Sequence, residues 1–387
     1  MSNKQSKKRK ILFVTGSRGE YGYIRPVLKL IKDSPSLEAE VLATNMHLLS
    51  EFGNSVNEFF YDDIKVDQKV YMALAGYTNA TMVKSLGVFM LSMSDILHNK
   101  RPDLILLAGD RGEQLVAAIA GAHMNIPIAH IQAGELSGNV DGLMRHAITH
   151  FAHIHFASNE DAERRLIKMG EQPFRVLRVG APQLDEFILG EIASPEKIAE
   201  RFSLNLKKPL ILVVQHPITE QAASAGQQMM ETMQAVISFG LQTVVVYPNN
   251  DAGSTAIQEC IEANRTINIR VERNVSRHTY GGLLNVASVI VGNSSSGIIE
   301  GPSFELPAVN IGRRQEGRFQ ASNVINVAQH DHKAIKLALK RALSKEFRDL
   351  LKNMVNPYGD GRASKRILKV LETMPIDEKL LFKKNTY

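Results

Sequence analysis

The feature that most constrains this chain is a repeated alternation of two kinds of segment. Short apolar, β-branched runs alternate with amphipathic stretches of helical length, and the pattern restarts in the second half. This alternation is typical of parallel sheets covered by helices, because parallel strands need long crossover connections. Strands are expected at 11–15, 39–44, 104–108, 126–131, 153–157 and 175–179, and then at 210–215, 243–247, 269–272, 289–292 and 308–311. We therefore predict an α/β protein with two successive doubly wound parallel sheets.

The length of the chain and the restart of the pattern define the expected domains. A chain of 387 residues is longer than one hydrophobic core usually supports. We predict an N-terminal Rossmann-like domain over residues 1–185 and a C-terminal one over 186–360, with the linker near 182–195. The stretch 361–387 contains helical spacing and is a candidate to fold back onto the N-terminal domain.

The composition argues against several classes of protein. No stretch approaches the roughly 18 consecutive apolar residues of a membrane helix, and the basic start lacks the apolar core of a signal peptide. The single cysteine, Cys260, agrees with a reducing compartment, so we expect a cytoplasmic protein. A modest net charge of +6, no Trp and only 6% aromatic residues disfavour nucleic acid as a partner, and the lack of a long apolar stretch disfavours a membrane.

The strand ends are the most informative segments, since ligands of open parallel sheets bind beyond the carboxyl ends of the strands. These ends read TGSRGEYG, TNMH, AGDRGE, IQAGE, QHPITE, PNNDAGS, GNSSSG and IGRRQ. One polar end is an ordinary loop, but a series of them predicts a central cleft to which both domains contribute.

Two of these ends are candidates for phosphate binding. Gly16, Gly19 and Gly22 follow GxxGxxG rather than the dinucleotide fingerprint GxGxxG, and no GxxxxGK[ST] loop occurs, so neither NAD nor that type of ATP site is expected. The stronger candidate is GNSSSGIIE, where Ser294 and Ser295 precede an expected helix and its free amides. The alternative is that one of these serines only caps the helix.

Carboxylates and arginines gather after two strands of the first half. Asp110 and Arg111 follow a strand directly, where a carboxylate can move protons and a guanidinium can hold an anion. Glu135 lies on the next expected loop. Asp141 and Arg145 are four residues apart near a helix start and are expected on one face, either as part of a site or as a surface ion pair.

Two histidines occupy strand ends that face the expected cleft. His216 ends the first strand of the second half and His47 follows the second strand of the first, so both are candidates for acid–base work or for holding phosphate. No metal site is expected, because neither an HExxH motif nor paired cysteines accompany the other clustered histidines, which are His123, His130, His146, His150, His153 and His155.

Together these strand ends resemble one enzyme family, the UDP-N-acetylglucosamine 2-epimerases, and within it the hydrolysing branch of sialic-acid-type biosynthesis. The motifs are TGSRGEYG, GDR, HIQAGELSG with DGLMRHAITH, HP, PNNDAGS and GNSSSGIIEGPSFELPAVNIGRRQEGR, in family order from residue 11 to about 318. The resemblance implies a glycosyltransferase-B arrangement of the two domains. It also implies that the C2 proton is removed, UDP leaves from C1, and water adds to the glycal to release N-acetylmannosamine, without a metal or nicotinamide cofactor.

The resemblance further implies roles for individual residues. The family's catalytic cluster is matched by Asp110, Asp141 and Arg145, with Arg111 in the GDR motif, His216 against the phosphates and His47 near the sugar. The positions that hold the nucleotide are matched by Arg18, Asn249, Ser294, Ser295, Glu300 and Arg314.

The chain departs from the family pattern at two positions. Many members carry Glu where this chain has Gln132, and a neutral amide cannot act as a base. Either Asp110, Asp141 or Glu135 then removes the C2 proton, or Gln132 marks a subgroup with a different sugar. At Gly301 the non-hydrolysing branch tends to carry a second acid, which places this chain on the hydrolysing side.

Three alternatives remain open at this point. The substrate is UDP-N-acetylglucosamine or UDP-2,4-diacetamido-2,4,6-trideoxyglucose, which leads to legionaminic acid. A glycosyltransferase of the same fold binds the same donor but needs an acceptor groove and one base at most. A non-catalytic UDP-sugar-binding protein binds without turnover.

The resemblance also implies a homodimer or homotetramer.

Overall fold

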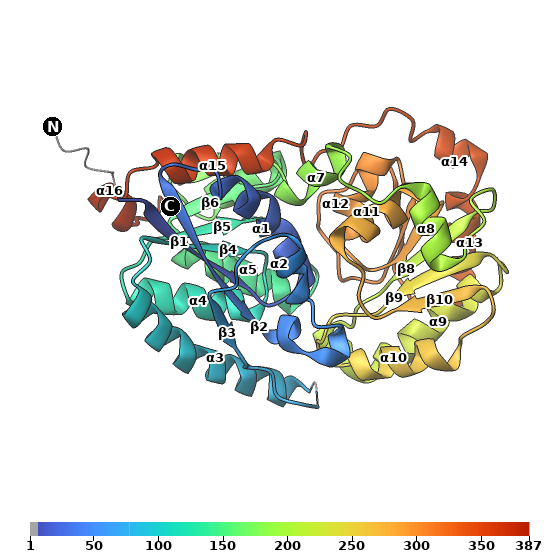
Figure 1. The fold of residues 1–387 in the computed structure, drawn as a ribbon. Coiled ribbons are helices and arrows are strands. Elements are labelled where there is room, and N and C mark those ends of the chain that lie inside the picture. Colours follow the sequence, from blue (N-terminus) through green and yellow to red (C-terminus); the bar gives the residue numbers. More distant parts are fainter. Residues whose placement is uncertain (1–6, 77, 387) are drawn as a thin grey trace.

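The computed structural model describes residues 7–76 and 78–386 and contains two parallel β-sheets that lie side by side (Figure 1). Residues 1–6 of the basic start lie outside the described part. The first sheet has the order β3-β2-β1-β4-β5-β6-β7. Its strands are β1 (Arg9–Thr15), β2 (Leu37–Thr44), β3 (Gln68–Val70), β4 (Leu104–Ala108), β5 (Ile128–Ile131), β6 (Ile154–Ala157) and β7 (Val176–Arg178).

The second sheet has the order β10-β9-β8-β11-β12-β13. Its strands are β8 (Leu210–Val214), β9 (Gln242–Val246), β10 (Ile269–Glu272), β11 (Val289–Gly292), β12 (Ala308–Ile311) and β13 (Val324–Val327). In both sheets the chain starts near the middle, winds to one edge and then returns to wind to the other, which is the doubly wound topology. The predicted pair of Rossmann-like sheets is therefore confirmed.

The prediction missed two edge strands, β3 and β13. Central strands are buried on both faces and appear as continuous apolar runs, whereas an edge strand is only partly covered. β3 has the sequence QKV and β13 has the sequence VINV, in which Asn326 is exposed. Neither sequence contains the continuous apolar run of the central strands.

Helices cover both faces of the first sheet, and the strand residues alternate between two cores. Ile11 and Phe13 of β1 pack with α1, whereas Leu12 and Val14 pack on the opposite face with α3 and α4. The helices of this half are α1 (Arg18–Ile31), α2 (Asn57–Tyr61), α3 (Asn79–Lys100), α4 (Gly112–His123), α5 (Val140–Phe151) and α6 (Glu160–Lys168). All neighbouring strands of this sheet are parallel, so their carboxyl ends lie at one edge of it.

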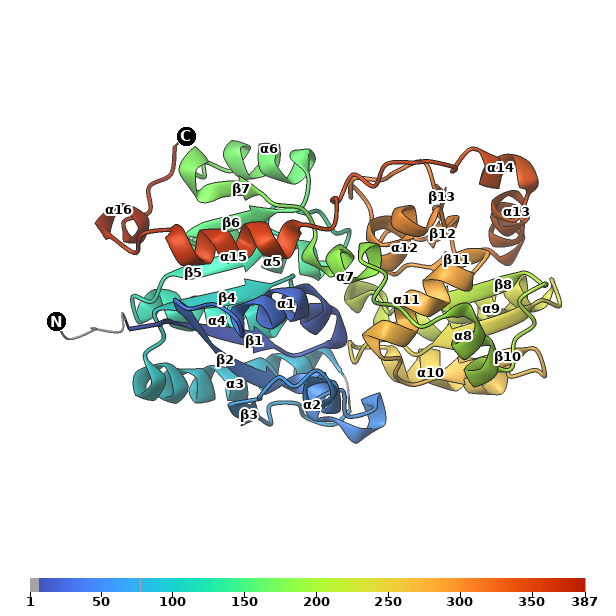
Figure 2. The same cartoon turned by 45° about the horizontal axis from the view of Figure 1, so that its top comes forward.

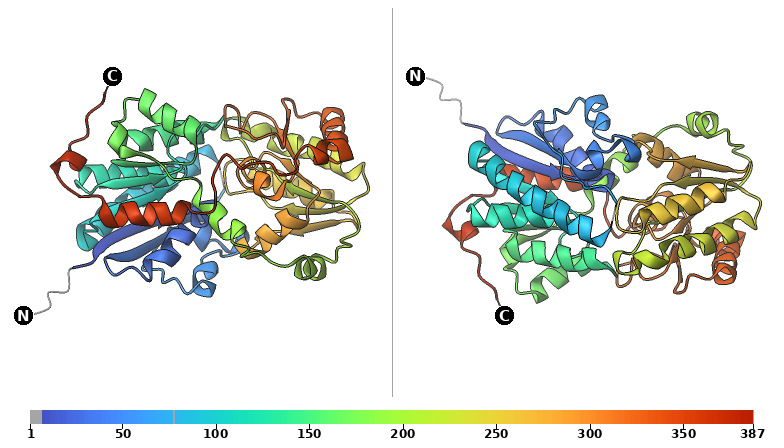
Figure 3. Two further views of the ribbon diagram at one scale, coloured as in Figure 1. Left: turned by 90° about the horizontal axis from the view of Figure 1, so that it is seen from above. Right: turned by 90° about the horizontal axis from the view of Figure 1, so that it is seen from below.

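The second sheet is covered in the same way. Its helices are α7 (Asp185–Ile188), α8 (Pro195–Phe202), α9 (Ala225–Ile237), α10 (Ser254–Ala263), α11 (Arg277–Val286), α12 (Ser296–Ile299), α13 (His332–Ala342) and α14 (Lys345–Asp349). The views from above and below show the chain passing from the first sheet to the second through α7 and returning before α15 (Figure 3).

The last segment crosses back to the first sheet. In α15 (Ala363–Thr373), Ile367 and Leu371 are fully buried in the same core cluster as the β1 and α1 residues, and Figure 2 shows α15 lying over that sheet. Near α16 (Glu378–Leu381), the buried guanidinium of Arg175 donates hydrogen bonds to the carbonyls of Leu380 at 2.6 Å and Lys379 at 2.9 Å. These contacts attach the end of the chain to the first half.

One described helix, α3, is long and apolar enough to cross a membrane by length and composition alone, with a mean hydropathy of 1.3. Its Phe89, Met93 and Leu97 recur every fourth residue and are buried against the first sheet. Val83 and Leu91 on its outer face are exposed. One face of α3 thus packs in the core of the first sheet, and the exposed face of the same helix is also partly apolar.

Candidate active site

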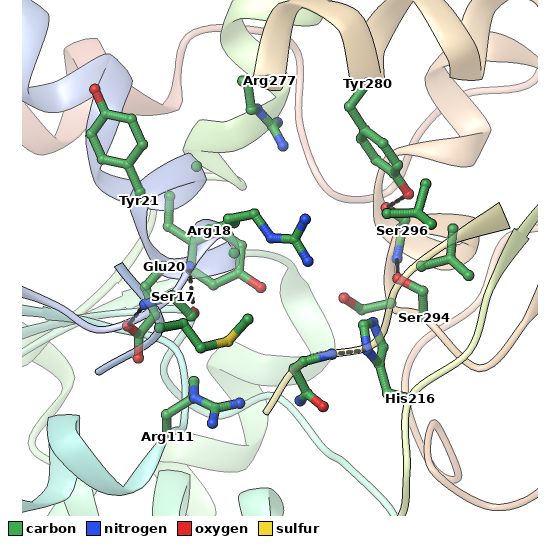
Figure 4. Close-up of a pocket in the computed structure, with 18 of the residues that line it drawn as sticks. Ser17, Arg18, Glu20, Tyr21, Arg111, His216, Arg277, Tyr280, Ser294 and Ser296 are labelled. Carbon is green, nitrogen blue, oxygen red and sulfur yellow. Dashed lines mark hydrogen bonds between the residues drawn. The ribbon is translucent and has the colours of Figure 1, made fainter. Parts of the chain in front are cut away.

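A cavity of about 210 Å³ lies between the carboxyl ends of the two sheets (Figure 4). Most of the predicted site residues line it, namely Arg18, Asp110, Arg111, Asp141, His216, Asn249, Ser294, Ser295, Glu300 and Arg314. Four predicted residues do not line it, namely His47, Gln132, Glu135 and Arg145. The polar strand ends therefore line a cavity as expected, and the other four predicted residues lie outside its wall.

Asp110 follows β4 and is surrounded by guanidinium groups. The Nη2 atom of Arg145 lies against its Oδ2 atom, and Ser137 donates a hydrogen bond to the same oxygen at 3.5 Å. Burial alone would raise the pKa of Asp110, but Arg145 and Arg318 hold it below its usual value. Asp110 is therefore an ionised carboxylate.

Asp141 lies in the first turn of α5 and has the opposite character. Burial raises its pKa to about 6, and the negative charges of Asp110 and Asp251 add to that effect. Asn139 donates a hydrogen bond to its Oδ2 atom at 2.8 Å, and the Arg314 guanidinium is 3.6 Å from the same atom. The two carboxylates in one cavity thus have pKa values that their surroundings move apart.

The surface ion pair between Asp141 and Arg145, which was the alternative interpretation of their spacing, is not found in the structure. Arg145 is 1% exposed and pairs with Asp110, while Asp141 faces Arg314 from the second half. The spacing of four residues places two side chains near one face, but a buried guanidinium is directed to the carboxylate that can compensate its desolvation. In this structure that carboxylate is at the end of β4.

Glu135 and Gln132 are buried behind the cavity wall. Asn159 donates a hydrogen bond to the Glu135 carboxylate at 2.7 Å, and burial raises the pKa of Glu135 despite the nearby Arg318. Gln132 has a φ of 62° and is 1% exposed, and neither polar atom of its side chain has a hydrogen-bond partner among the described residues. Their positions set them apart from the two carboxylates that line the cavity.

His216 is a neutral hydrogen-bond donor at the cavity wall. Burial, with Arg314 and Arg18 nearby, lowers its pKa well below the usual value. The backbone N–H of Asn249 donates to its Nδ1 atom at 3.1 Å, and a backbone N–H can only donate. The remaining ring proton is therefore on Nε2, which makes this atom available to an acceptor.

His47 is completely buried rather than exposed to the cavity. Its Nε2 atom lies 3.0 Å from the hydroxyl of Thr15 and its Nδ1 atom 2.8 Å from the hydroxyl of Ser55. Burial lowers its pKa to about 3, so the ring is neutral. The neighbouring Met46 lines the cavity in its place.

The serine-rich end of β11 forms the opposite wall. Ser294, Ser295 and Ser296 all line the cavity. The helix that follows, α12, is only one turn long, and the Ser294 hydroxyl accepts a hydrogen bond from the Ser296 N–H at 3.3 Å. One serine therefore has a local contact with the start of the helix, while all three serines line the cavity.

Several cavity residues were not predicted. Arg277 and Tyr280 begin α11 and line one end of the cavity, where Tyr280 donates a hydrogen bond to Ser296 at 2.7 Å (Figure 4). The Arg277 guanidinium lies 3.9 Å from the Glu300 carboxylate, and burial raises the pKa of Glu300. Arg277 and Tyr280 lie in the segment that follows β10, so the rule that identifies the other strand ends applies to them as well.

Arg111 links the two halves across the cavity. Its Nη2 atom donates to Asp251 at 2.8 Å and to Asn250 at 3.2 Å, both of which follow β9. Its Nε atom is 3.4 Å from Glu113 at the start of α4. Beside this contact, Asn250 donates to Asn45 at 2.7 Å, so a second hydrogen bond joins the same two edges.

The cavity contains the groups needed for proton transfer beside an anion. Arg18, Arg111, Arg277 and Arg314 provide positive charge on its wall, and Asp110 and Asp141 provide two carboxylates of different basicity. Among the described residues, one group could share a metal ion, Glu231 with Asp331 and His332, and it is not part of this wall.

Comparisons with known proteins agree with this arrangement. The family model described as UDP-N-acetylglucosamine 2-epimerase matches residues 29–372. The UDP-N,N'-diacetylbacillosamine 2-epimerase (hydrolyzing) of Legionella pneumophila is 37% identical over 98% of this chain and 100% of its own. The UDP-N-acetylglucosamine 2-epimerase of Neisseria meningitidis serogroup B is 30% identical over 87% of this chain and 88% of its own.

A solved structure shows the same fold. The UDP-GlcNAc 2-epimerase from Neisseria meningitidis bound to UDP-GlcNAc superimposes with a TM-score of 0.79 at 20% sequence identity, covering 94% of this chain and 99% of that chain. The expected glycosyltransferase-B arrangement of two Rossmann-like domains is confirmed.

Proposed function

The chain belongs to the UDP-N-acetylglucosamine 2-epimerase family, and on this premise we propose that it is a hydrolysing 2-epimerase of a UDP-2-acetamido sugar. Its products are UDP and the free sugar with inverted configuration at C2. The observation that carries the proposal is the pair Asp110 and Asp141, whose pKa values are moved in opposite directions in a cavity lined by arginines. Titratable groups whose surroundings move their pKa values apart are typical of acid and base roles in one site.

In the proposed reaction Asp141 removes the C2 proton. A base with a pKa of about 6 is largely ionised at neutral pH and still accepts a proton. Asp110 stays ionised beside Arg145 and Arg318 and keeps the pKa of Asp141 raised by its negative charge. Glu135 has no direct access to the cavity, which supports Asp141 as the base in a chain that has Gln132 at the family's Glu position.

The departure of UDP from C1 places negative charge on the diphosphate. The Nε2–H of His216 and the hydroxyls of Ser294 and Ser295 donate hydrogen bonds to the phosphate oxygens, and Arg18 and Arg314 neutralise the charge. At the far end, the Glu300 carboxylate accepts hydrogen bonds from the ribose hydroxyls. Water then adds to the glycal. Its hydroxyl bonds to C1, and C2 receives a proton on the face opposite to the one that lost the original proton, which inverts the configuration at C2.

The similarity to a relative named as hydrolyzing supports the hydrolysing branch, and two UDP-sugars are candidate substrates. The relatives described above are named for UDP-N,N'-diacetylbacillosamine and for UDP-N-acetylglucosamine. Both substrates carry the 2-acetamido group and the UDP leaving group that the proposed chemistry requires. The products are the precursors of nonulosonic acids of the legionaminic or sialic type.

The test is product identification with purified protein, each of the two UDP-sugars, and a chelator in place of added metal. The proposal predicts UDP and free 2-acetamido-mannose-type sugar in equal amounts, without any acceptor. Accumulation of a UDP-linked epimer would show a non-hydrolysing enzyme. Turnover only in the presence of an acceptor would show a transferase, and tight binding without turnover would show a binding protein.

A further inference from the structure

Two loops from different halves of the chain meet beside the cavity. Residues 135–138 lie between β5 and α5 in the first half, and residues 313–318 lie between β12 and β13 in the second. The backbone N–H of Gly138 donates a hydrogen bond to the carbonyl of Arg314 at 2.9 Å. A Cβ atom at position 138 would lie 1.8 Å from the carbonyl oxygen of Arg313, so this close approach requires glycine. We call the contact between these two segments the loop junction.

Arg318 crosses the loop junction and is buried on the far side of it. It is 6% exposed and is not part of the cavity wall. Its Nε atom donates a hydrogen bond to the carbonyl of Leu136 at 3.1 Å, and its Nη2 atom donates to the hydroxyl of Ser137 at 3.3 Å. A buried guanidinium depends on such partners, and here the other half of the chain provides them. The position of Arg318 is therefore determined by the loop junction.

The hydroxyl of Ser137 connects two arginines with a carboxylate of the cavity. It accepts hydrogen bonds from Arg318 at 3.3 Å and from the Nη1 atom of Arg145 at 3.4 Å. A guanidinium can only donate, and a hydroxyl has two acceptor sites and one proton. With both acceptor sites occupied, the proton is directed to the Oδ2 atom of Asp110 at 3.5 Å. The two arginines thus orient this hydroxyl toward Asp110.

The charge around Asp110 also comes from both halves. Burial raises the pKa of Asp110, whereas the guanidinium groups of Arg145, Arg318 and Arg314 lower it. Arg314 and Arg318 belong to the second half, so part of this positive charge reaches Asp110 only across the loop junction. Beside the adjacent Arg111, the titratable and charged groups near Asp110 are Tyr23 of α1, His130 of β5, Asp141 and Arg145 of α5, and Arg314 and Arg318.

We infer that Arg318 is a positioning residue for the proposed reaction, which acts from the second half by orienting the Ser137 hydroxyl toward Asp110 and by supplying positive charge to that carboxylate. Because Arg318 reaches Asp110 only through the loop junction, the charge of the carboxylate pair depends on contact between the two halves. Proton transfer at C2 is thereby coupled to the docking of the half that carries Ser294 and Ser295. The inference rests on the proposed function for the role of Asp110.

The first test measures the ionisation of Asp110 and does not depend on turnover. Carbon NMR follows protein labelled at its aspartate carboxyl carbons, in the presence of UDP, between about pH 4 and pH 8, and Asp110→Asn assigns the signal. We expect Asp110 to remain ionised over this range in the unchanged protein and to have a higher pKa in Arg318→Met, because an opposite charge is lost. Identical titration of Asp110 in both proteins overturns the inference.

The second test measures the pH dependence of turnover. The ratio of kcat/KM for Arg318→Met to that for the unchanged protein is expected to be at least about tenfold lower at pH 5.5 than at pH 7.5, because a second carboxylate then takes up a proton on the acid side. Arg313→Met is the matched control. It removes the same charge from the same segment, but this side chain is 47% exposed and lies 4.0 Å from Glu220. A ratio for Arg318→Met that does not change with pH would show a merely structural role and overturns the inference.

A third variant changes the loop junction and keeps the Arg318 side chain. Gly138→Ala introduces a Cβ atom against the Arg313 carbonyl and is expected to show the same acid-side loss as Arg318→Met. Gly87→Ala is the control, since a Cβ atom on this exposed residue of α3 meets nothing within 4 Å. Unaltered pH dependence of Gly138→Ala overturns the coupling to the junction. A raised pKa of Asp110 in Arg318→Met, without turnover of either UDP-sugar by the unchanged protein, would instead refute the proposed function and leave the effect of Arg318 on Asp110 standing.

Discussion

Arg145 lies against Asp110 and not against Asp141, four residues before it in the same helix. This pairing gives the two carboxylates of the cavity different environments. Asp110 faces a fully buried guanidinium, which holds its pKa low. Asp141 has a raised pKa, and its Oδ2 atom lies 3.6 Å from the guanidinium of Arg314. This contact supports the proposed division of labour, together with Arg318 near Asp110 and the burial of Asp141.

Replacement of Asp141 tests its role as the base. Asp141→Asn is expected to lower kcat by at least about 100-fold, the lower end of what a positioned general base contributes, while UDP binding is retained. Turnover with each UDP-sugar and titration with UDP measure the two effects. Asp161→Asn is the control, since that carboxylate pairs with Arg165 on α6 outside the cavity. Near-normal turnover of Asp141→Asn would remove Asp141 from the mechanism.

The pKa of Asp141 predicts the acid side of the pH profile. A base works only when ionised, so its activity is present above its pKa and is lost as the pH falls through that value. With a pKa of about 6, kcat/KM is expected to fall about tenfold for each pH unit below about pH 6. Initial rates between pH 4.5 and 8 in buffers of constant ionic strength measure this. A profile that is flat down to pH 4.5 would contradict the assignment.

Replacement of Arg145 tests the pairing itself. Arg145→Met leaves Asp110 without its closest positive charge, so we expect a higher pKa for Asp110 and a loss of about 3–5 kcal/mol of stability, as for other broken buried ion pairs. Urea unfolding followed by circular dichroism measures the stability. The matched change Arg165→Met removes a more exposed pair and is expected to cost about 1 kcal/mol or less. Equal effects of the two changes would argue against the buried pairing.

His216 is predicted to act as a neutral donor to the diphosphate. His216→Phe removes the Nε2–H and is expected to weaken UDP binding about tenfold, the loss of one net hydrogen bond of about 1.4 kcal/mol. Uridine, which lacks phosphates, is expected to bind both proteins equally, and titration of both ligands separates the two effects. Parallel losses for uridine and UDP would show that the change disturbs the fold of the cavity rather than a phosphate contact.

The central strands were predictable from sequence because their burial on both faces leaves a continuous apolar run. The ranges 289–292 and 308–311 coincide with β11 and β12, two central strands of the second sheet. The edge strands β3 and β13 have no such run and were missed, whereas β7 and β10 at the opposite edges were predicted. A continuous apolar run in the sequence thus indicates burial on both faces of a sheet and not the strand conformation itself.

Site residues were predictable where they follow a strand directly, as Asp110 and His216 do. Their partners were not, because the choice of Arg145 between two carboxylates is made by burial and by the approach of distant segments. Arg318 illustrates the same limit. It lies beyond the end of β12 and donates hydrogen bonds across to Leu136 and Ser137 of the other half, a contact that no local pattern encodes.

The account is tested most directly by the fate of the C2 proton. Purified protein is incubated with each UDP-sugar in heavy water, and the products are followed by proton NMR, with Asp141→Asn as the inactive reference. The account predicts UDP together with a free sugar of inverted C2 configuration that carries deuterium at C2. A free sugar that retains its original hydrogen at C2 would contradict it, because UDP would then have been released without deprotonation at that carbon.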